Sequence, residues 1–163
     1  MAELKVVTFP KTILRKKAEK VPKVSDAERA ILDGMAKAMY LSQGVGLAAV
    51  QVGIDKQLAV VDTGEGLVKM VNPVIVKRDG REVQEEGCLS VPGACVKVKR
   101  AKRIVVSYLN EDGEINELKA EGLLARAIQH EIDHLQGTLI IDYLNPLQKI
   151  LYKKTGSRKK PKR

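Results

Sequence analysis

The only two histidines of this chain lie four residues apart in the stretch "QHEIDHLQG", residues 129–137. On an α-helix, residues i and i+4 share one face, so His130 and His134 could both bind one metal ion. Glu131 follows the first histidine, and the resulting H-E-x-x-H pattern is typical of a two-histidine metal site with glutamate as the base. The alternative, an exposed helix without a metal, would leave the spacing of the only two histidines unexplained.

An open catalytic zinc site needs a third protein ligand and leaves its fourth position to water. Zincin proteases take that ligand from a downstream His or Glu, but this chain has neither after His134, and Asp142 is the only acid beyond the helix. Upstream, Cys88 lies in "EGCLSVPG", and its thiolate would complete a Cys-His-His set. The competing interpretation is a small buried apolar residue, and the residues alone leave both open. Cys95, in the strand-like run "ACVKV", is expected to be such a buried residue.

A glycine-containing stretch, "GVGLAAVQ" at residues 44–51, is the third feature with a chemical interpretation. Two glycines two residues apart occur in nucleotide-binding loops, but the third glycine of that fingerprint is absent and no strand is expected before the stretch. The alternative is a loop whose backbone lies against a substrate, with Gln51 offering an amide donor.

Two helices with apolar residues at helical spacing are expected to frame these features. Ser25 and Glu28 have the spacing of a capping box, so the first helix is predicted from about 26 to 42. The second helix carries the two histidines and ends at Gly137. The first helix is expected to bury Ala27, Ala30, Ile31, Met35, Ala38 and Met39, and the second Leu124, Ala127, Ile128 and Leu135.

Residues 57 to about 119 have the composition of strands and turns, because short valine-rich runs alternate with glycine-containing ones. The run "RIVVSYLNEDGEINELKA" predicts a hairpin around Asn110–Gly113. No helix separates these strands, so mainly antiparallel sheets are expected. The predicted fold class is therefore α+β, with the sheets packed around a central H-E-x-x-H helix, an N-terminal helix and a short C-terminal helix.

Length and composition indicate one folded unit. The chain has 163 residues, of which 44% are hydrophobic and 30% charged, an ordinary mixture for a soluble globular protein. No run approaches the roughly 18–20 apolar residues that a membrane span needs, and no secretory signal is recognisable, so a cytoplasmic location is expected. Two cysteines are too few for a disulfide framework and are expected to be free, catalytic or metal-binding.

Positive charge is concentrated at the C-terminal end. Residues 146–163 contain eight Lys and Arg and no acid, whereas the rest of the chain has 21 basic and 20 acidic residues. Asn145 and Pro146 predict a short helix there, preceded by a short apolar strand or turn in "TLIIDYL", and "KKTGSRKKPKR" is expected to be disordered. Such a tail is typical of an arm that binds phosphate backbones, and the alternative is a solvated tail that only aids solubility.

The stretches "GVGLAAVQ", "EGCLS" and "QHEIDHLQG" resemble, in order and spacing, the three signature motifs of peptide deformylases. These metallohydrolases remove the formyl group from the N-terminal methionine of new bacterial and organellar proteins. The length and the α+β pattern extend the resemblance over nearly the whole chain. It implies a catalytic domain at residues 1–145 and a basic C-terminal helix and tail at 146–163, shorter and more basic than is usual in the family.

The resemblance implies the metal site and the catalytic groups. Cys88, His130 and His134 would bind one divalent ion, Fe(II) in the cell, for which Zn, Ni or Co can substitute. Glu131 would be the general acid and base. Physical chemistry is consistent with these roles, because a divalent ion makes hydroxide available at neutral pH and a carboxylate can move the water proton to the leaving amine.

The resemblance also implies how the substrate is bound. The Gln51 side chain and the Leu89 backbone N–H would stabilise the negative charge that grows on the formyl oxygen. Methionine would enter an apolar pocket, and an extended peptide could pair with residues 44–46 and 86–89 by strand addition. The expected substrate-binding residues are Gly44, Val45, Gly46, Glu86, Gly87, Leu123 and Ala127.

The expected partners are N-formyl-methionyl nascent peptides, and the ribosome through the basic tail, since the C-terminal extension docks there in some members of the family. A monomer without membrane contacts is expected. Two rival hypotheses are a zinc peptidase and a nucleic-acid-binding module with a structural metal. The missing downstream ligand argues against the first, and the near-neutral body with 3% aromatic residues argues against the second.

Overall fold

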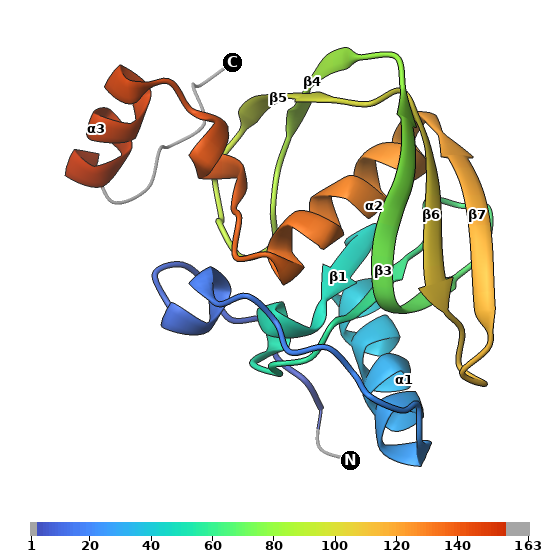
Figure 1. The fold of residues 1–163 in the computed structure, drawn as a ribbon. Helices are drawn as coiled ribbons and strands as arrows, with labels where there is room; N and C mark the ends of the chain where they lie inside the picture. Colours follow the sequence, from blue (N-terminus) through green and yellow to red (C-terminus); the bar gives the residue numbers. More distant parts are fainter. Residues whose placement is uncertain (1–2, 156–163) are drawn as a thin grey trace.

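Residues 3–155, which the computed structural model describes, form three α-helices and two antiparallel sheets (Figure 1). One sheet has the strand order β1-β2-β3-β6-β7, and the other pairs β4 with β5. The α+β class and the antiparallel pairing predicted from the sequence are confirmed. The elements are α1 (Asp26–Leu41), β1 (Gly46–Ala48), β2 (Leu58–Val61), β3 (Val68–Asp79), β4 (Glu82–Glu86), β5 (Val96–Arg100), β6 (Arg103–Leu109), β7 (Ile115–Glu121), α2 (Gly122–Leu135) and α3 (Pro146–Thr155), with 3-10 turns η1 (Thr12–Arg15), η2 (Ala49–Val52) and η3 (Ile140–Tyr143).

The helix that carries both histidines, α2, lies at the centre of the fold, between the β4–β5 hairpin and the five-stranded sheet (Figure 1). Its buried side chains Ala125, Ile128 and Leu135 share a core cluster with Met70 and Val106 of the sheet. This packing fixes the rotation of the helix about its axis. The opposite face, which holds the histidines, is thereby directed at the β4–β5 hairpin.

Gly137 ends α2, as predicted, and only glycine fits there. Its φ of +80° lies in the left-handed region, and its N–H donates to the carbonyl of His134 at 3.0 Å. A Cβ at this position would lie 2.5 Å from the carbonyl oxygen of Arg15. The close approach lets the N-terminal segment pack directly against the end of α2.

The bounds predicted for α1 are confirmed, but its predicted buried face and cap are partly wrong. Ala27 and Ala30 are exposed, whereas Leu32 and Met35 are fully buried. The larger side chains bury more apolar area, so the helix turns them inward and leaves the alanines in solvent. Ser25 is the N-cap residue, but its hydroxyl donates to the Glu28 carboxylate at 3.1 Å and makes no cap bond to the backbone.

The β6–β7 hairpin around Asn110–Gly113 is confirmed. The Asn110 side-chain oxygen accepts hydrogen bonds from the backbone N–H groups of Asp112 and Glu114, at 2.9 and 3.0 Å. Gly113 supplies the positive φ of the turn, +78°. The turn chemistry written in "LNEDGE" therefore sets the register of these two strands.

At the C-terminal end, the run at residues 138–144 contains the 3-10 turn η3 and no strand, so the turn alternative is correct and the strand alternative is wrong. The predicted cap of α3 is confirmed, because Asn145 and Gln148 exchange side-chain to backbone hydrogen bonds at 2.8 and 3.0 Å. Tyr152 anchors α3 on the body, near Phe9 at a ring distance of 6.3 Å. The predicted disordered segment lies mostly in residues 156–163, outside the described residues. None of the described helices is long and apolar enough to cross a membrane.

Candidate active site

Helix α2 and the connection between β4 and β5 bring three donor atoms together. Cys88 Sγ lies 3.2 Å from His134 Nε2, which lies 3.1 Å from His130 Nε2. All three atoms lie within 4.8 Å of one another. Of the two interpretations that the sequence left open for Cys88, this position beside both imidazoles favours the ligand.

The donor set fits a divalent transition-metal ion. Bonds of about 2.0–2.3 Å in a tetrahedral site would separate neighbouring ligand atoms by roughly 3.3–3.6 Å, close to the separations seen here. His134 Nδ1 is buried without a hydrogen-bond partner among the described residues, so the polar neighbours of this ring are Cys88 and His130 on its Nε2 side. One thiolate and two imidazoles accept Fe, Ni, Co or Zn.

The pKa values of the histidines show that the site favours one positive charge. Burial, together with the neighbouring His130, holds the pKa of His134 well below its usual value. Burial also lowers the pKa of His130, but hydrogen bonds to Cys88 and Glu86 outweigh it and raise the value to about 10. A bound cation would supply that positive charge in place of the proton.

Glu131 is 2% exposed and faces the backbone of Gly46. A Cβ on Gly46 would lie 2.7 Å from Glu131 Oε2, so the glycine lets the strand β1 approach the carboxyl group. Burial raises the pKa of Glu131 to about 7, although the positive charges of His130 and Arg100 oppose the shift. A carboxyl group with this pKa can both accept and donate a proton near neutral pH.

Two hydrogen-bond donors lie on residues beside Cys88, the Gln51 amide and the Leu89 backbone N–H. The Gln51 side-chain oxygen accepts a hydrogen bond from Ala48 N–H at 2.9 Å, which orients the amide. Its Nε2 then donates to Ser90 Oγ at 3.1 Å and lies 3.8 Å from Cys88 Sγ. No described residue accepts a hydrogen bond from Leu89 N–H, so this donor remains available for a ligand.

An open cleft of about 520 Å³ leads to the cluster. Every residue that the sequence predicted for the site lines it except His134, which is buried behind the others. Val45 and Leu123 expose apolar surface in this cleft, 44% and 56% of each residue. A second hollow of about 600 Å³, lined in part by Arg78, Lys99 and Tyr143, lies near the same helix, and neither histidine lines it.

One expectation for a single residue is wrong. Cys95 is exposed and lines the cleft, just before β5 begins, so the prediction that it is buried in a strand is wrong. The alternation of β5 sends Val96 and Val98 inward and leaves position 95 outside. Glu86 lines the cleft, but its carboxylate is buried and bonded to His130, so its contact with substrate stays a prediction.

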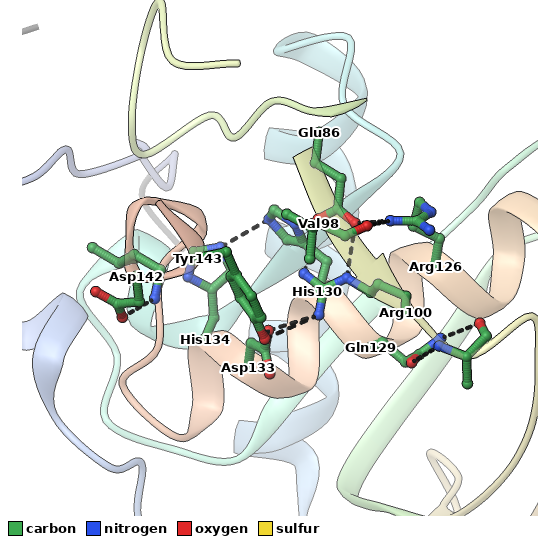
Figure 2. Close-up of polar contacts among 12 residues, drawn as sticks. Glu86, Val98, Arg100, Arg126, Gln129, His130, Asp133, His134, Asp142 and Tyr143 are labelled. Atoms are coloured by element: carbon green, nitrogen blue, oxygen red, sulfur yellow. Dashed lines mark hydrogen bonds and ion pairs between the residues drawn. The ribbon is translucent and has the colours of Figure 1, made fainter. Parts of the chain in front are cut away.

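Figure 2 shows the surroundings of Glu86, which sequence reasoning missed. Its carboxylate accepts hydrogen bonds from Arg100, from Arg126 and from His130 Nδ1, the last at 2.9 Å. Burial opposes the charge, but the bonds from Arg100 and His130 outweigh it and lower the pKa of Glu86 to about 2. One signal was available: Arg126 stands four residues before His130 within the apolar run "LLARAI", where a charge requires a buried partner.

The comparisons with known proteins agree with this geometry. The sequence profile of the polypeptide deformylase family matches residues 3–150. A peptide deformylase from Thermodesulfovibrio yellowstonii is 43% identical over 98% of this chain and 100% of its own length. Another from Pelotomaculum thermopropionicum is 48% identical over 94% of this chain and 99% of its own.

Solved structures give the same result. A peptide deformylase from Legionella pneumophila superimposes with a TM-score of 0.88 at 40% identity, over 94% of this chain and 92% of that one. The enzyme from Ehrlichia chaffeensis in complex with actinonin also gives 0.88, at 39% identity, over 94% of this chain and 98% of that one. Both relatives are similar over almost their whole length.

Proposed function

We propose how the site works from one premise: the chain belongs to the polypeptide deformylase family and is a metal-dependent hydrolase that removes the N-formyl group from new proteins, releasing formate. The observation that carries the proposal is the convergence of Cys88, His130 and His134 on one point beside the buried Glu131. The roles of individual residues, the metal and the further partners follow below as parts of this proposal.

Cys88, His130 and His134 hold the ion, and Fe(II) is the proposed metal in the cell, with Zn, Ni or Co as substitutes. When bound, the ion acidifies a water molecule and polarises the formyl carbonyl, so that hydrolysis proceeds at neutral pH. His130 donates its Nδ1–H to Glu86, because a carboxylate paired with two arginines can only accept. This leaves the Nε2 lone pair free for the metal.

Glu131 moves the proton. Its pKa of about 7 without a metal allows the carboxylate to take a proton from the attacking water and to deliver it to the departing amine. It is not a ligand, since its side chain lies outside the three-atom cluster and against Gly46. The products are formate and a free methionine N-terminus.

The Gln51 amide and the Leu89 backbone N–H stabilise the formyl oxygen as negative charge grows on it. The hydrogen bond from Ala48 N–H supports this role, because it keeps the Gln51 oxygen away from the reacting group and its Nε2 toward it. The Leu89 N–H can bind the formyl oxygen without first breaking a hydrogen bond to another described residue.

Binding of the peptide uses the cleft walls. Val45, Leu123 and Ala127 line the proposed methionine pocket, and the exposed apolar surface of the first two supports this assignment. β1 is the edge strand of its sheet, and among the described residues β4 pairs only with β5, so each strand has one unpaired edge, and residues 44–46 and 86–89 line the cleft. An extended peptide can add to such edges, and the backbones of Gly44, Gly46, Glu86 and Gly87 then contact it.

The proposal also covers location and partners. The catalytic domain, residues 1–145, acts as a monomer in the cytoplasm, and the basic segment 146–163 tethers it to ribosomal RNA. Eight positive charges without an acid support the tether, since phosphate contacts release counterions. Co-sedimentation with ribosomes at low and high salt, for the full chain and for a version ending at Thr155, tests it. Equal pelleting of both forms would exclude a tether by the last eight residues.

The decisive test of the reaction is formate release from a formyl-methionyl peptide by protein purified without oxygen, with metal content measured on the same sample. The unformylated peptide is the control. One metal per chain and formate release without peptide-bond cleavage are expected. Cleavage of the unformylated peptide would favour the zinc peptidase instead.

A further inference from the structure

Arg100, in β5, holds two carboxylates on the metal-binding side of the fold with one guanidinium group. Its Nε and Nη2 donate to the two oxygens of Glu86, each at 2.8 Å. Its Nη1 donates to Asp133 at 2.7 Å. The Arg100 side chain is 4% exposed and that of Glu86 is 6% exposed, so these bonds form largely out of water, where charge-assisted hydrogen bonds are strong.

Both carboxylates stand beside proposed metal ligands (Figure 2). Glu86 accepts the hydrogen bond of His130 Nδ1, and Asp133 directly precedes His134 in α2. Asp133 also accepts a hydrogen bond from the Tyr143 hydroxyl at 2.5 Å, and the Arg100 guanidinium lies over the Tyr143 ring at 5.2 Å. The guanidinium thus joins β4, α2 and η3 at the two ligand-bearing turns of the helix.

Arg126, the other arginine on Glu86, is used differently. One of its nitrogens donates both to Glu86 Oε2, at 2.6 Å, and to the carbonyl of Val98, and the other donates to the carbonyl of Glu82. It therefore ties the helix to the backbone of the β4–β5 hairpin. Only Arg100 grips both oxygens of Glu86 and so fixes the plane of the carboxylate that faces His130.

We propose that Arg100 is a positioning residue for the deformylation reaction: by holding Glu86 and Asp133 together, it fixes the His130 ring with Nε2 directed at the metal. This inference rests on the metal ligands proposed above. Lysine cannot replace it, because a single ammonium group lacks the planar fork that binds both oxygens of one carboxylate while reaching a second. Without the fork, Glu86 can rotate, and His130 loses its fixed orientation.

The test compares Arg100→Lys with Arg103→Lys. Arg103 forms an exposed pair with Asp79 at 2.6 Å, so its replacement makes the same chemical change where no metal ligand is involved. Each protein is loaded with Co(II), whose absorption spectrum reports ligand geometry. The rate of metal loss to a chelator, kcat and KM for a formyl-methionyl peptide, and thermal unfolding are measured on the same samples.

For Arg100→Lys we expect metal loss roughly 10- to 100-fold faster, an altered Co(II) spectrum and a lower kcat with little change in KM. Arg103→Lys should match the wild type in all of these. A merely structural Arg100 would lower the unfolding temperature and leave the spectrum and the rate of metal loss unchanged, and that outcome would overturn the proposal.

Two further variants make the result unambiguous. If Arg100→Lys does not fold, Glu86→Gln, which keeps the side-chain shape, should show the same faster metal loss, and a wild-type rate would count against the proposal. Cys88→Ser tests the ligand set itself. If it holds Co(II) as the wild type does, the proposed ligands are wrong; if it fails to bind while Arg100→Lys is normal, only the role of Arg100 is refuted.

Discussion

The carboxyl group of Glu131 is buried, and burial raises its pKa to about 7, so the folded chain prefers the protonated form. The unfolded chain releases this proton near pH 4.5, so charging Glu131 destabilises the fold increasingly between about pH 4.5 and 7 and fully above pH 7. A shift of this size corresponds to a penalty on the order of 3 kcal/mol. Catalysis and stability therefore place opposite demands on this residue.

Glu131→Gln should lower kcat by roughly 10²–10⁴ and leave metal content unchanged, because the role proposed for the side chain is to move protons and not to bind the metal. In metal-free protein, the same change should raise the free energy of unfolding at pH 8 and have little effect at pH 4.5. Urea unfolding at both pH values measures this. Equal stability of the variant and the wild type at pH 8 would show that burying the charged carboxylate does not lower the free energy of unfolding.

The two cysteines should respond differently to replacement by serine. Cys88→Ser should lose most of its metal, since a hydroxyl is a poor substitute for a thiolate. Cys95→Ser should retain it, because Cys95 is exposed and lies outside the three-atom cluster. Metal content after dialysis gives the answer, and equal loss in both variants would remove Cys88 from the ligand set.

Spacing along the chain was enough to predict which residues come together, and their roles stay predictions. The i, i+4 rule brought His130 and His134 onto one face, and elimination left Cys88 as a candidate ligand. The buried partners could not be found in the same way, because Arg100 is 30 residues away from His130 along the chain and meets Glu86 only through tertiary packing. Cys95 was misplaced because the start of β5 could not be located to one residue.

At the level of elements, β1 approaches α2 so closely that it leaves no room for a side chain at Gly46. Gly46→Ala would put a methyl group 2.7 Å from Glu131 Oε2 and 3.0 Å from Glu131 Cδ. The carboxyl group must then move, and a displacement of this kind costs up to about 10²-fold in rate. We expect a lower kcat with metal content unchanged.

A double variant provides the control for this displacement. If Gly46→Ala acts through the carboxylate, then Gly46→Ala/Glu131→Gln should be about as active as Glu131→Gln alone. Multiplied losses in the double variant would show that the glycine has another function, such as pairing with the peptide.

Element boundaries and types were largely predictable, because turn residues and caps act locally. Asn110 and Gly113 fixed a hairpin, Gly137 ended a helix, and Asn145 capped the last one. The buried face of α1 was not predictable from spacing, since alanines fit on either side of a helix and neighbouring elements decide which large side chains turn inward.

At the scale of the whole molecule, Tyr152 is the buried side chain of α3 among those of the helix that the structure describes. Tyr152 is 7% exposed and belongs to a cluster with Leu14 and Leu139, whereas Leu147 is 66% exposed on the same helix. Tyr152→Ala should lower the free energy of unfolding by roughly 2–4 kcal/mol, and Leu147→Ala should change it by less than about 0.5 kcal/mol. Similar small effects of both would mean that α3 is only loosely attached.

The overall class of fold followed from the order of helical and strand-like segments, and the division at residue 145 stays a prediction. The packing does not follow this division, because α3 begins the basic segment and its Tyr152 packs in the cluster that contains Leu14 and Leu139. The arrangement of the two sheets around α2 could not be read from the sequence, since it depends on contacts between residues far apart in the chain.

The open edges of β1 and β4 limit the period during which a new N-terminus can bind. A new N-terminus can add to these edges only while its own backbone is extended and unpaired, and a cleft of about 520 Å³ does not admit a folded domain. Protein synthesis at roughly 5–20 residues per second leaves on the order of 10 s before a domain of about 100 residues is complete. Deformylation therefore competes kinetically with co-translational folding, and chains whose first residues fold early should keep their formyl group.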